Sequence, residues 1–133
     1  MKIQIIKGVV IATSLFLGST AAHAACSQGS FAGTWEVFIT KADSEAISWQ
    51  SCSLNVAKNG TISSGTCKSY EGIVESVNSD EITTSSDCSV TGAIVIGAET
   101  YTISDGQVGR NKFDMSGVGT TSIGLFTFTG VKK

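Results

Sequence analysis

The sequence of 133 residues contains no proline and only one histidine, His23. Histidine is the usual general base of enzymes and a common zinc ligand. Because His23 lies in a segment that we predict to be removed, Ser-His-Asp and Cys-His catalysis and histidine-ligated metal sites are excluded in the remainder. Catalysis in the remainder would have to use carboxylate groups or a lysine nucleophile. The spacing of the acids and lysines along the sequence does not single out a catalytic residue. We expect neither a metal nor a cofactor.

Residues 1–24 have the pattern of a cleavable export signal. Lys2 and Lys7 give a positive start, residues 8–17 are mostly apolar, and Ala22-His23-Ala24 has the small-x-small form that signal peptidase cuts. The apolar run is shorter than the roughly 20 residues of a membrane-spanning helix. We expect a soluble chain that begins at Ala25, lies in the periplasm or outside the cell, and has no membrane span.

The chain has no excess of positive charge. Nine Lys and Arg face eleven Asp and Glu, and loss of Lys2 and Lys7 with the signal leaves a net charge of −4. Nucleic-acid binding needs a basic patch that neutralises phosphates, so we expect no nucleic-acid partner.

Helix-favouring composition is also absent from residues 25–133. Glycine, serine and threonine alternate with Val, Ile and aromatic residues, and this mixture favours strands over helices. A disordered Ser/Gly-rich chain would lack such regularly spaced apolar residues. The composition therefore predicts a single all-β domain over residues 25–133.

The four cysteines are Cys26, Cys52, Cys67 and Cys88. Their spacing fits neither the close ligand pairs of zinc sites nor the CxxC pattern of redox enzymes. In an exported chain an even number of cysteines favours two disulfides, for which three connectivities exist.

Asn59-Gly60 separates two alternating segments, which is a strong hairpin signal. A two-residue turn places Cys52 opposite Cys67, whereas a three-residue loop with Gly60 in the left-handed conformation pairs Val56 with Ile62. A bulge at Ser64-Gly65 would allow both. We therefore favour a Cys52–Cys67 disulfide, which leaves Cys26–Cys88.

The alternation of apolar residues predicts about eight or nine short strands and no helix. These are residues 35–40, 47–58, 61–67, 72–77, 81–85, 88–96, 100–104, 112–118 and 125–131, with turns at 41–45, 78–80, 97–99 and 105–106. The strand at 47–58 requires a phase change, because Ile47 and Trp49 differ in parity from Leu54 and Val56. The spacing of strands and turns predicts an up-and-down antiparallel β-barrel or a β-sandwich.

Glycines cluster in the last two predicted strands, at Gly117, Gly119, Gly124 and Gly130. Bare backbone there permits either strong bending or close packing of a neighbouring chain.

The segment Phe31-Ala32-Gly33-Thr34-Trp35 resembles the Gly-x-Trp opening of lipocalin-like barrels, including avidins and the secreted bacterial inhibitors of metalloproteases. In those families the tryptophan lies on the first strand and packs across one end of the barrel. Cys52-x-Leu54-x-Val56 is similar to the next strand of the inhibitors. The resemblance implies a barrel that binds a protein or a small ligand.

Seven large aromatic residues, Trp35, Trp49, Tyr70, Tyr101, Phe113, Phe126 and Phe128, are interpreted as packing in the core or across a barrel end. A small eight-stranded barrel either fills its interior or holds one ligand. For the second case, the candidate ligand-binding residues are Trp35, Trp49, Tyr101 and Phe126.

Two acids lie within apolar alternations, Glu36 and Glu75, and are the candidates for paired carboxylate chemistry. Asp105, Asn111 and Asp114 are acceptors that a calcium ion would use, but their spacing does not match a calcium loop and favours a solvated turn.

Three functions follow as hypotheses. The first is a non-enzymatic exported barrel that binds a protein or a small apolar ligand. The second is a structural or surface-assembly subunit that self-associates through a glycine-rich edge. The third is a carboxylate-based hydrolase.

Overall fold

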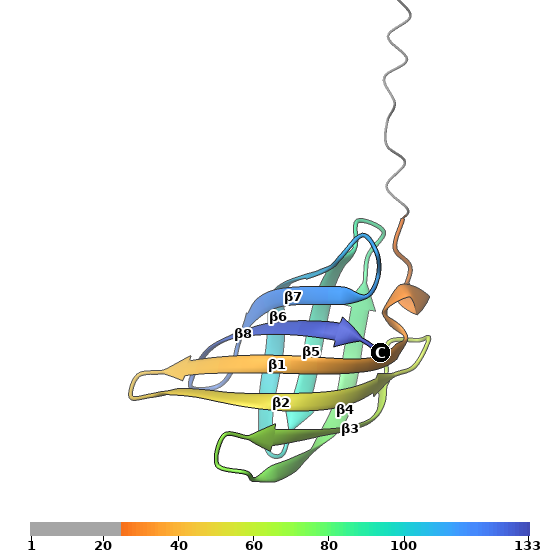
Figure 1. The fold of residues 1–133 in the computed structure, drawn as a ribbon. Coiled ribbons are helices and arrows are strands. Elements are labelled where there is room, and N and C mark those ends of the chain that lie inside the picture. The colour runs from red at the N-terminus through yellow and green to blue at the C-terminus, as the bar shows by residue number, and fades with distance from the viewer. Residues whose placement is uncertain (1–24) are drawn as a thin grey trace, which may run out of the picture.

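The computed structural model describes residues 25–133, and the side chains of all of these except Ser79 and Asp80. Eight antiparallel strands follow one another around a closed barrel (Figure 1). They are β1 (Gly33–Asp43), β2 (Ile47–Val56), β3 (Ile62–Ser69), β4 (Val74–Thr84), β5 (Ser89–Ile96), β6 (Glu99–Val108), β7 (Asp114–Thr120) and β8 (Gly124–Lys132). A 3-10 turn, η1 (Gln28–Phe31), precedes β1. The structure confirms the all-β prediction and decides between its two forms in favour of the barrel. The predicted export signal lies outside the described residues.

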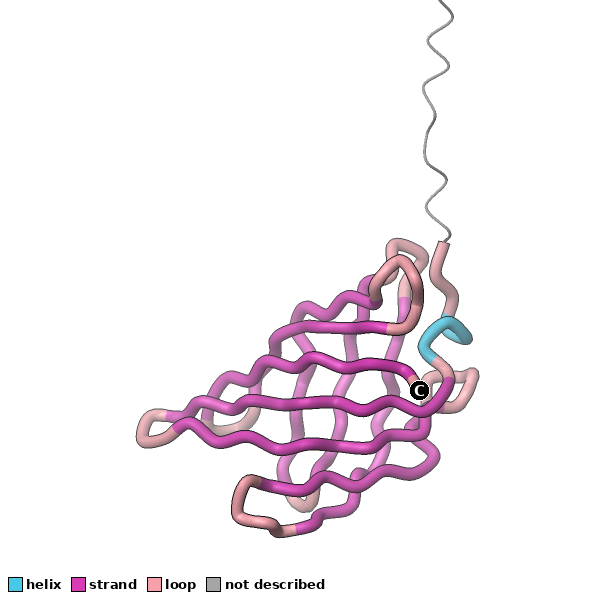
Figure 2. The backbone as a smooth tube through the Cα atoms, viewed as in Figure 1, coloured by secondary structure: helices cyan, strands magenta, loops and turns pink. Residues whose placement is uncertain are grey.

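Pairing of the first strand with the last closes the barrel. Nine residue pairs join β1 to β8, from Trp35 opposite Lys132 to Asp43 opposite Gly124. Each strand therefore has a neighbour on both sides, and the loops gather at the two ends (Figure 2). The glycine-rich β8 is consequently not an edge strand.

The interior of the barrel is filled by side chains. Alternate residues of each strand point inward, and the buried set is almost entirely apolar. An apolar cavity lined by residues such as Ile39, Ile94 and Phe126 has a volume of about 30 Å³. By size, that space could hold one or two water molecules at most. Its lining offers them no hydrogen-bond partner, because it is apolar. The interior is thus a core and offers no room for a small-molecule ligand.

Glycines of β7 make room for phenylalanines of β8. Gly117 is opposite Phe128 and Gly119 is opposite Phe126 in the register of the two strands. A Cβ at Gly119 would lie 2.5 Å from Cζ of Phe126, and one at Gly117 would lie 2.6 Å from Cε1 of Phe128. Each phenylalanine ring therefore occupies the space that a side chain at the opposite glycine would fill. Packing within this chain thus accounts for the two glycines, without contact from a neighbouring chain.

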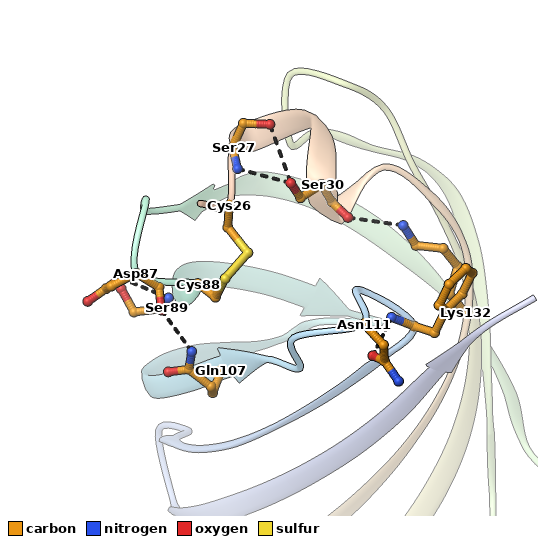
Figure 3. Close-up of a disulfide and its surroundings, with 10 residues drawn as sticks. Cys26, Ser27, Ser30, Asp87, Cys88, Ser89, Gln107, Asn111 and Lys132 are labelled. Atoms are coloured by element: carbon orange, nitrogen blue, oxygen red, sulfur yellow. Dashed lines mark hydrogen bonds between the residues drawn. A yellow bond between two sulfur atoms is a disulfide. The ribbon is translucent and has the colours of Figure 1, made fainter. Parts of the chain in front are cut away.

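The N-terminal segment closes one end of the barrel (Figure 3). Cys26 is linked to Cys88 by a disulfide. Behind it, the fully buried Trp35 donates a hydrogen bond from Nε1 to the carbonyl of Phe31 at 2.8 Å and stacks on its ring at 5.1 Å. Lys132 Nζ lies 5.2 Å from the centroid of the Trp35 ring. Trp35 thus packs across one end of the barrel.

Gln28 ties the same segment to the barrel wall. Its Oε1 accepts a hydrogen bond from the Thr84 amide at 2.8 Å, and its Nε2 donates to the carbonyl of Ile82. This contact requires a glycine at position 60, because a Cβ there would overlap Nε2 of Gln28. Gly60 also has the left-handed backbone conformation that the hairpin predicts, with φ of 86°.

Both predicted disulfides are confirmed, Cys26–Cys88 and Cys52–Cys67. The hairpin has the predicted pairs, Cys52 with Cys67 and Val56 with Ile62. The bulge that reconciles them lies at Ser63, between Ile62 and Ser64, and not at Ser64-Gly65. Gly65 is instead an ordinary ladder residue opposite Leu54, where the absence of a side chain leaves space for the Leu54 methyl groups.

The phase change predicted within 47–58 is wrong. The β1–β2 register runs without a shift from Gly33 opposite Val56 to Ala42 opposite Ile47. An uninterrupted ladder keeps strict alternation, so Ile47 and Trp49 face outward while Gln50 and Cys52 face inward.

The turns predicted at 78–80 and 105–106 are also wrong, because both segments lie inside long strands. The β4–β5 register shifts between Ser79 and Ile82, and the β6–β7 register shifts between Ile103 and Asp105. Asn, Ser, Asp and Gly are typical of turns, but a bulge that bends a barrel strand accepts the same residues. The predicted nine segments therefore become eight longer strands.

We expect Gly119→Ala to destabilise the barrel by about 2 kcal/mol, because the new methyl group overpacks the core against Phe126 and the carbonyl of Thr102. Urea denaturation measures the change. Gly29→Ala is the matched control, since its Cβ would find only Ser27 Oγ at 3.8 Å. Equal stability of the two variants would contradict the packing role of Gly119.

We expect loss of either disulfide, in Cys26→Ala/Cys88→Ala or Cys52→Ala/Cys67→Ala, to cost about 3–4 kcal/mol, given sequence separations of 62 and 15 residues. Only the first pair of substitutions should release the closed end. Hydrogen exchange then accelerates at residues 26–32 in that variant alone. Unchanged protection there would show that Gln28 and Lys132 hold the segment without the disulfide.

Candidate functional site: the open end of the barrel

The end of the barrel opposite η1 has no plug among the described residues, and its inward-facing side chains are polar. A pocket of about 240 Å³ lies there, which we call the mouth pocket. Its floor is formed by Ile39, Gln50 and Tyr101, which are buried. Lys41 and Glu99 follow as the next inward positions of β1 and β6 toward the solvent. The chain thus changes from an apolar core to a charged mouth within one or two residues of each strand.

A hydrogen-bonded network connects these polar side chains. Lys41 Nζ lies 2.7 Å from Glu99 Oε2, and the same oxygen accepts a hydrogen bond from the Tyr101 hydroxyl at 3.3 Å. Gln50 Nε2 donates to the Tyr101 hydroxyl at 3.1 Å. The Lys41 and Glu99 side chains are only 18 % and 23 % exposed, so this ion pair is more shielded from water than a surface pair.

The network alters the acidity of two groups. Burial by itself lowers the pKa of Lys41, but the hydrogen bond to Glu99 and the charges of Glu99 and Tyr101 outweigh it, so the pKa is raised. Burial and the negative charge of Glu99 raise the pKa of Tyr101 as well. Lys41 is therefore a protonated cation, and Tyr101 a neutral phenol, at neutral pH.

Glu75 faces the same pocket from β4. It pairs in register with Cys67, whose side chain points into the barrel, so Glu75 points to the same side. Its carboxylate lies against the β5–β6 turn, where a Cβ at Gly97 would be 2.5 Å from Glu75 Oε1. Glu75 and Glu99 therefore approach the mouth pocket from adjacent parts of the wall.

Three aromatic side chains lie next to one another on the outer wall beside the mouth. Phe38, Trp49 and Tyr70, here called the aromatic triad, are 46 %, 45 % and 55 % exposed. The ring centroids of Phe38 and Trp49 are 5.5 Å apart, and those of Trp49 and Tyr70 are 6.5 Å apart. Ile47 at the tip of β2 extends the apolar surface. Trp49 and Tyr70 also line the mouth pocket.

The four predicted ligand-binding residues do not form one site. Trp35 lies at the closed end, and Tyr101 and Phe126 pack edge to face in the core at 5.2 Å. Trp49 is on the outer face of β2, and of the four predicted residues only Trp49 and Tyr101 line the mouth pocket together. Of the seven aromatic residues interpreted as core or barrel-end packing, Trp49, Tyr70 and Phe113 are exposed, because each falls on the outward phase of a strand or in a loop.

The two predicted candidate acids are separated by the barrel wall. Glu36 faces outward on β1 and forms an ion pair with Lys133 at 2.7 Å, whose hydrogen bond lowers the pKa of Glu36 despite partial burial. Glu75 faces the mouth pocket. The two acids that do share a pocket are Glu75 and Glu99. Glu99 was not predicted as a site residue, because residues 97–99 were expected to form a turn.

One of the acceptors considered for calcium is engaged within its own loop. Asn111 Oδ1 accepts a hydrogen bond from the Phe113 amide at 3.0 Å, which is a local turn. Within residues 25–133, no cluster of three or more His, Cys, Asp or Glu side chains is arranged to hold a metal ion. The described part of the chain also has no helix of the length and apolarity needed to cross a membrane.

Comparison with known proteins supports the fold class. No protein-family model and no curated protein matches the chain. A solved structure described as a redesigned β-barrel is similar to it, with a TM-score of 0.58 over 82 % of this chain and 98 % of that one, at 16 % sequence identity. Likeness at that identity concerns the fold alone, so the chain is a small antiparallel β-barrel protein.

The pKa shifts of the mouth network predict a loss of stability at alkaline pH. Unfolded tyrosine and lysine titrate near pH 10 to 10.4, and both pKa values are higher in the fold. Their contribution is complete below about pH 10 and is lost as pH rises through the folded values. The free energy of unfolding from urea titrations should fall as the pH rises above about 10, and fall less in Tyr101→Phe. An identical slope in that variant would contradict the role of Tyr101.

Proposed function

We propose that the protein is an exported, non-enzymatic binding module that contacts a partner protein through the aromatic triad beside the open end of its barrel. One observation carries the proposal: Phe38, Trp49 and Tyr70 lie next to one another on the outer wall, are each about half exposed, and do not belong to the buried core. Tryptophan and tyrosine are enriched among the residues that dominate the energy of protein interfaces. Clustered exposed apolar surface marks an interaction site.

A protein suits this surface better than a small apolar ligand. Small ligands occupy concave sites that enclose most of their surface. The apolar interior has about 30 Å³, whereas the triad lies on the outer face of β1, β2 and the turn after β3 with its side chains 45–55 % exposed. A partner with an apolar contact surface of its own would cover the triad.

Binding is also a better reading than catalysis. The pKa of Lys41 is raised, so its amine holds a proton and is a poor nucleophile. Glu99 is engaged by Lys41 and Tyr101, which is the arrangement of a fixed ion pair. Glu36, one of the two acids predicted as catalytic candidates, is on the outer wall in an ion pair with Lys133 and does not share a pocket with Glu75.

Export is part of the proposal and rests on two features. Both disulfides fit an oxidising compartment, the periplasm or the outside of the cell. Residues 1–24 have the charge, apolar run and cleavage pattern of a signal peptide. The Gly-x-Trp resemblance to secreted inhibitors is consistent with this, since Trp35 lies on the first strand and across one barrel end.

Site-specific photo-crosslinking in the producing cells tests the partner surface. A photoreactive phenylalanine replaces Ser51, which is outward-facing and opposite Phe38, or Thr91, which is outward-facing on β5. We expect a discrete adduct with another protein from position 51 only, and its loss in Phe38→Ser/Trp49→Ser.

The other outcomes count against the proposal. Equal adducts from positions 51 and 91, no adduct from either, or an adduct that survives Phe38→Ser/Trp49→Ser would overturn it. An adduct of twice the chain's own mass would favour the self-assembling subunit instead. Circular dichroism of each variant confirms that the barrel is folded, as expected for substitutions of exposed side chains.

A further inference from the structure

The mouth pocket faces more negative charge than the chain neutralises. Glu75, Glu99 and Lys41 line it, and Lys41 is paired with Glu99. Within residues 25–133 the Glu75 carboxylate forms no ion pair. One uncompensated carboxylate therefore faces a space of about 240 Å³, and it would attract a cation of small molecular size.

The second carboxylate has an unused acceptor. Glu99 Oε2 receives both Lys41 and Tyr101, while Glu99 Oε1 is buried and has no hydrogen-bond partner. A buried acceptor without a donor is unfavourable, and nearly all such groups in folded proteins find one. This oxygen is closed off from solvent in the present conformation, so a ligand N–H group would reach Glu99 Oε1 only after rotation of the Glu99 side chain.

Aromatic rings form the remaining wall. Trp49 and Tyr70 stand at the rim, tilted 48° to each other. Their faces attract positive charge and cover alkyl groups. The pocket already contains one such contact, because Lys41 Nζ lies 5.9 Å from the centroid of the Tyr101 ring.

We propose that the mouth pocket binds an alkylammonium group, with its N–H donors directed to Glu75 and, after rotation of the Glu99 side chain, to Glu99 Oε1, and with its alkyl part against Trp49 and Tyr70. The group belongs either to a free small amine or to a lysine side chain of a protein. The inference shares Trp49 and Tyr70 with the partner surface proposed above but does not require that surface, because the carboxylates of Glu75 and Glu99 face the mouth whereas Phe38 and Ser51 face outward.

Titration of the full residue 25–133 domain with n-butylammonium chloride tests the proposal. Backbone ¹H–¹⁵N shifts at Gln50, Ser69 and Glu99 report on the pocket, with sodium chloride keeping ionic strength constant. We expect saturable shifts from n-butylammonium, weaker binding of tetramethylammonium, which has the charge without N–H donors, and no binding of n-butanol.

Two variants on the same strand provide the matched comparison. Glu75→Gln should weaken n-butylammonium binding about fivefold or more, since it removes the unpaired charge. Glu81→Gln makes the same change of charge near the closed end, where the backbone of Glu81 forms an isolated antiparallel β-bridge with Thr61. This variant should leave binding unchanged. Both residues are exposed, so both variants should fold.

Nα-acetyl-lysine methylamide separates the two sources of the ammonium group. Binding at least as tight as that of n-butylammonium indicates a protein lysine, and binding of n-butylammonium alone indicates a free amine. Equal binding of n-butylammonium and n-butanol, absence of saturable shifts, or equal effects of Glu75→Gln and Glu81→Gln would overturn the proposal.

Discussion

Closure of the sheet between β1 and β8 is the constraint on which the rest of the structure depends. An eight-stranded closed sheet encloses a narrow space, and its volume is set by the strand number and the tilt. The chain fills that space with inward side chains and uses Gly117 and Gly119 to admit Phe128 and Phe126. Closure also removes the free edges through which strands add to other strands. Recognition is thereby left to the two ends and the outer wall.

The two ends are built for different purposes. At one end the disulfide at Cys26, the side chain of Gln28 and the stack of Phe31 on Trp35 hold the N-terminal segment over the core. At the other end the inward positions become charged, and the network around Glu99 is the first layer in contact with solvent. A partly buried ion pair that leaves one oxygen without a hydrogen bond is unfavourable for stability alone, which makes this end the candidate ligand site.

Local patterns predicted those parts of the fold that local geometry controls. The Asn59-Gly60 turn defines its own hairpin, so the Cys52–Cys67 disulfide and the pair of Val56 with Ile62 followed from the residues alone. Where turn-favouring residues occur inside a strand, the predicted turns at 78–80 and 105–106 were wrong. Asp105-Gly106 bends β6 without ending it, because its neighbours β5 and β7 continue to pair on both sides.

The candidate site was harder to predict because it combines five strands. Lys41, Gln50, Glu75 and Tyr101 are separated along the chain, and nothing in their spacing indicates that closure directs all of them to one end. Trp49 was assigned to a ligand-binding interior by its aromatic character. The unbroken β1–β2 register places it outside, next to Phe38 and Tyr70.

The sequence by itself determined the class of the fold, the two disulfides and the absence of histidine chemistry after residue 24, because composition, alternation and a tight turn act over a few residues. Only the tertiary structure decided that the barrel is closed and filled, that one end is plugged, and that Glu99 meets Lys41 and Tyr101 at the other. The physical reason is that inward or outward placement depends on register, and register along β4 and β6 depends on bulges that the neighbouring strands impose.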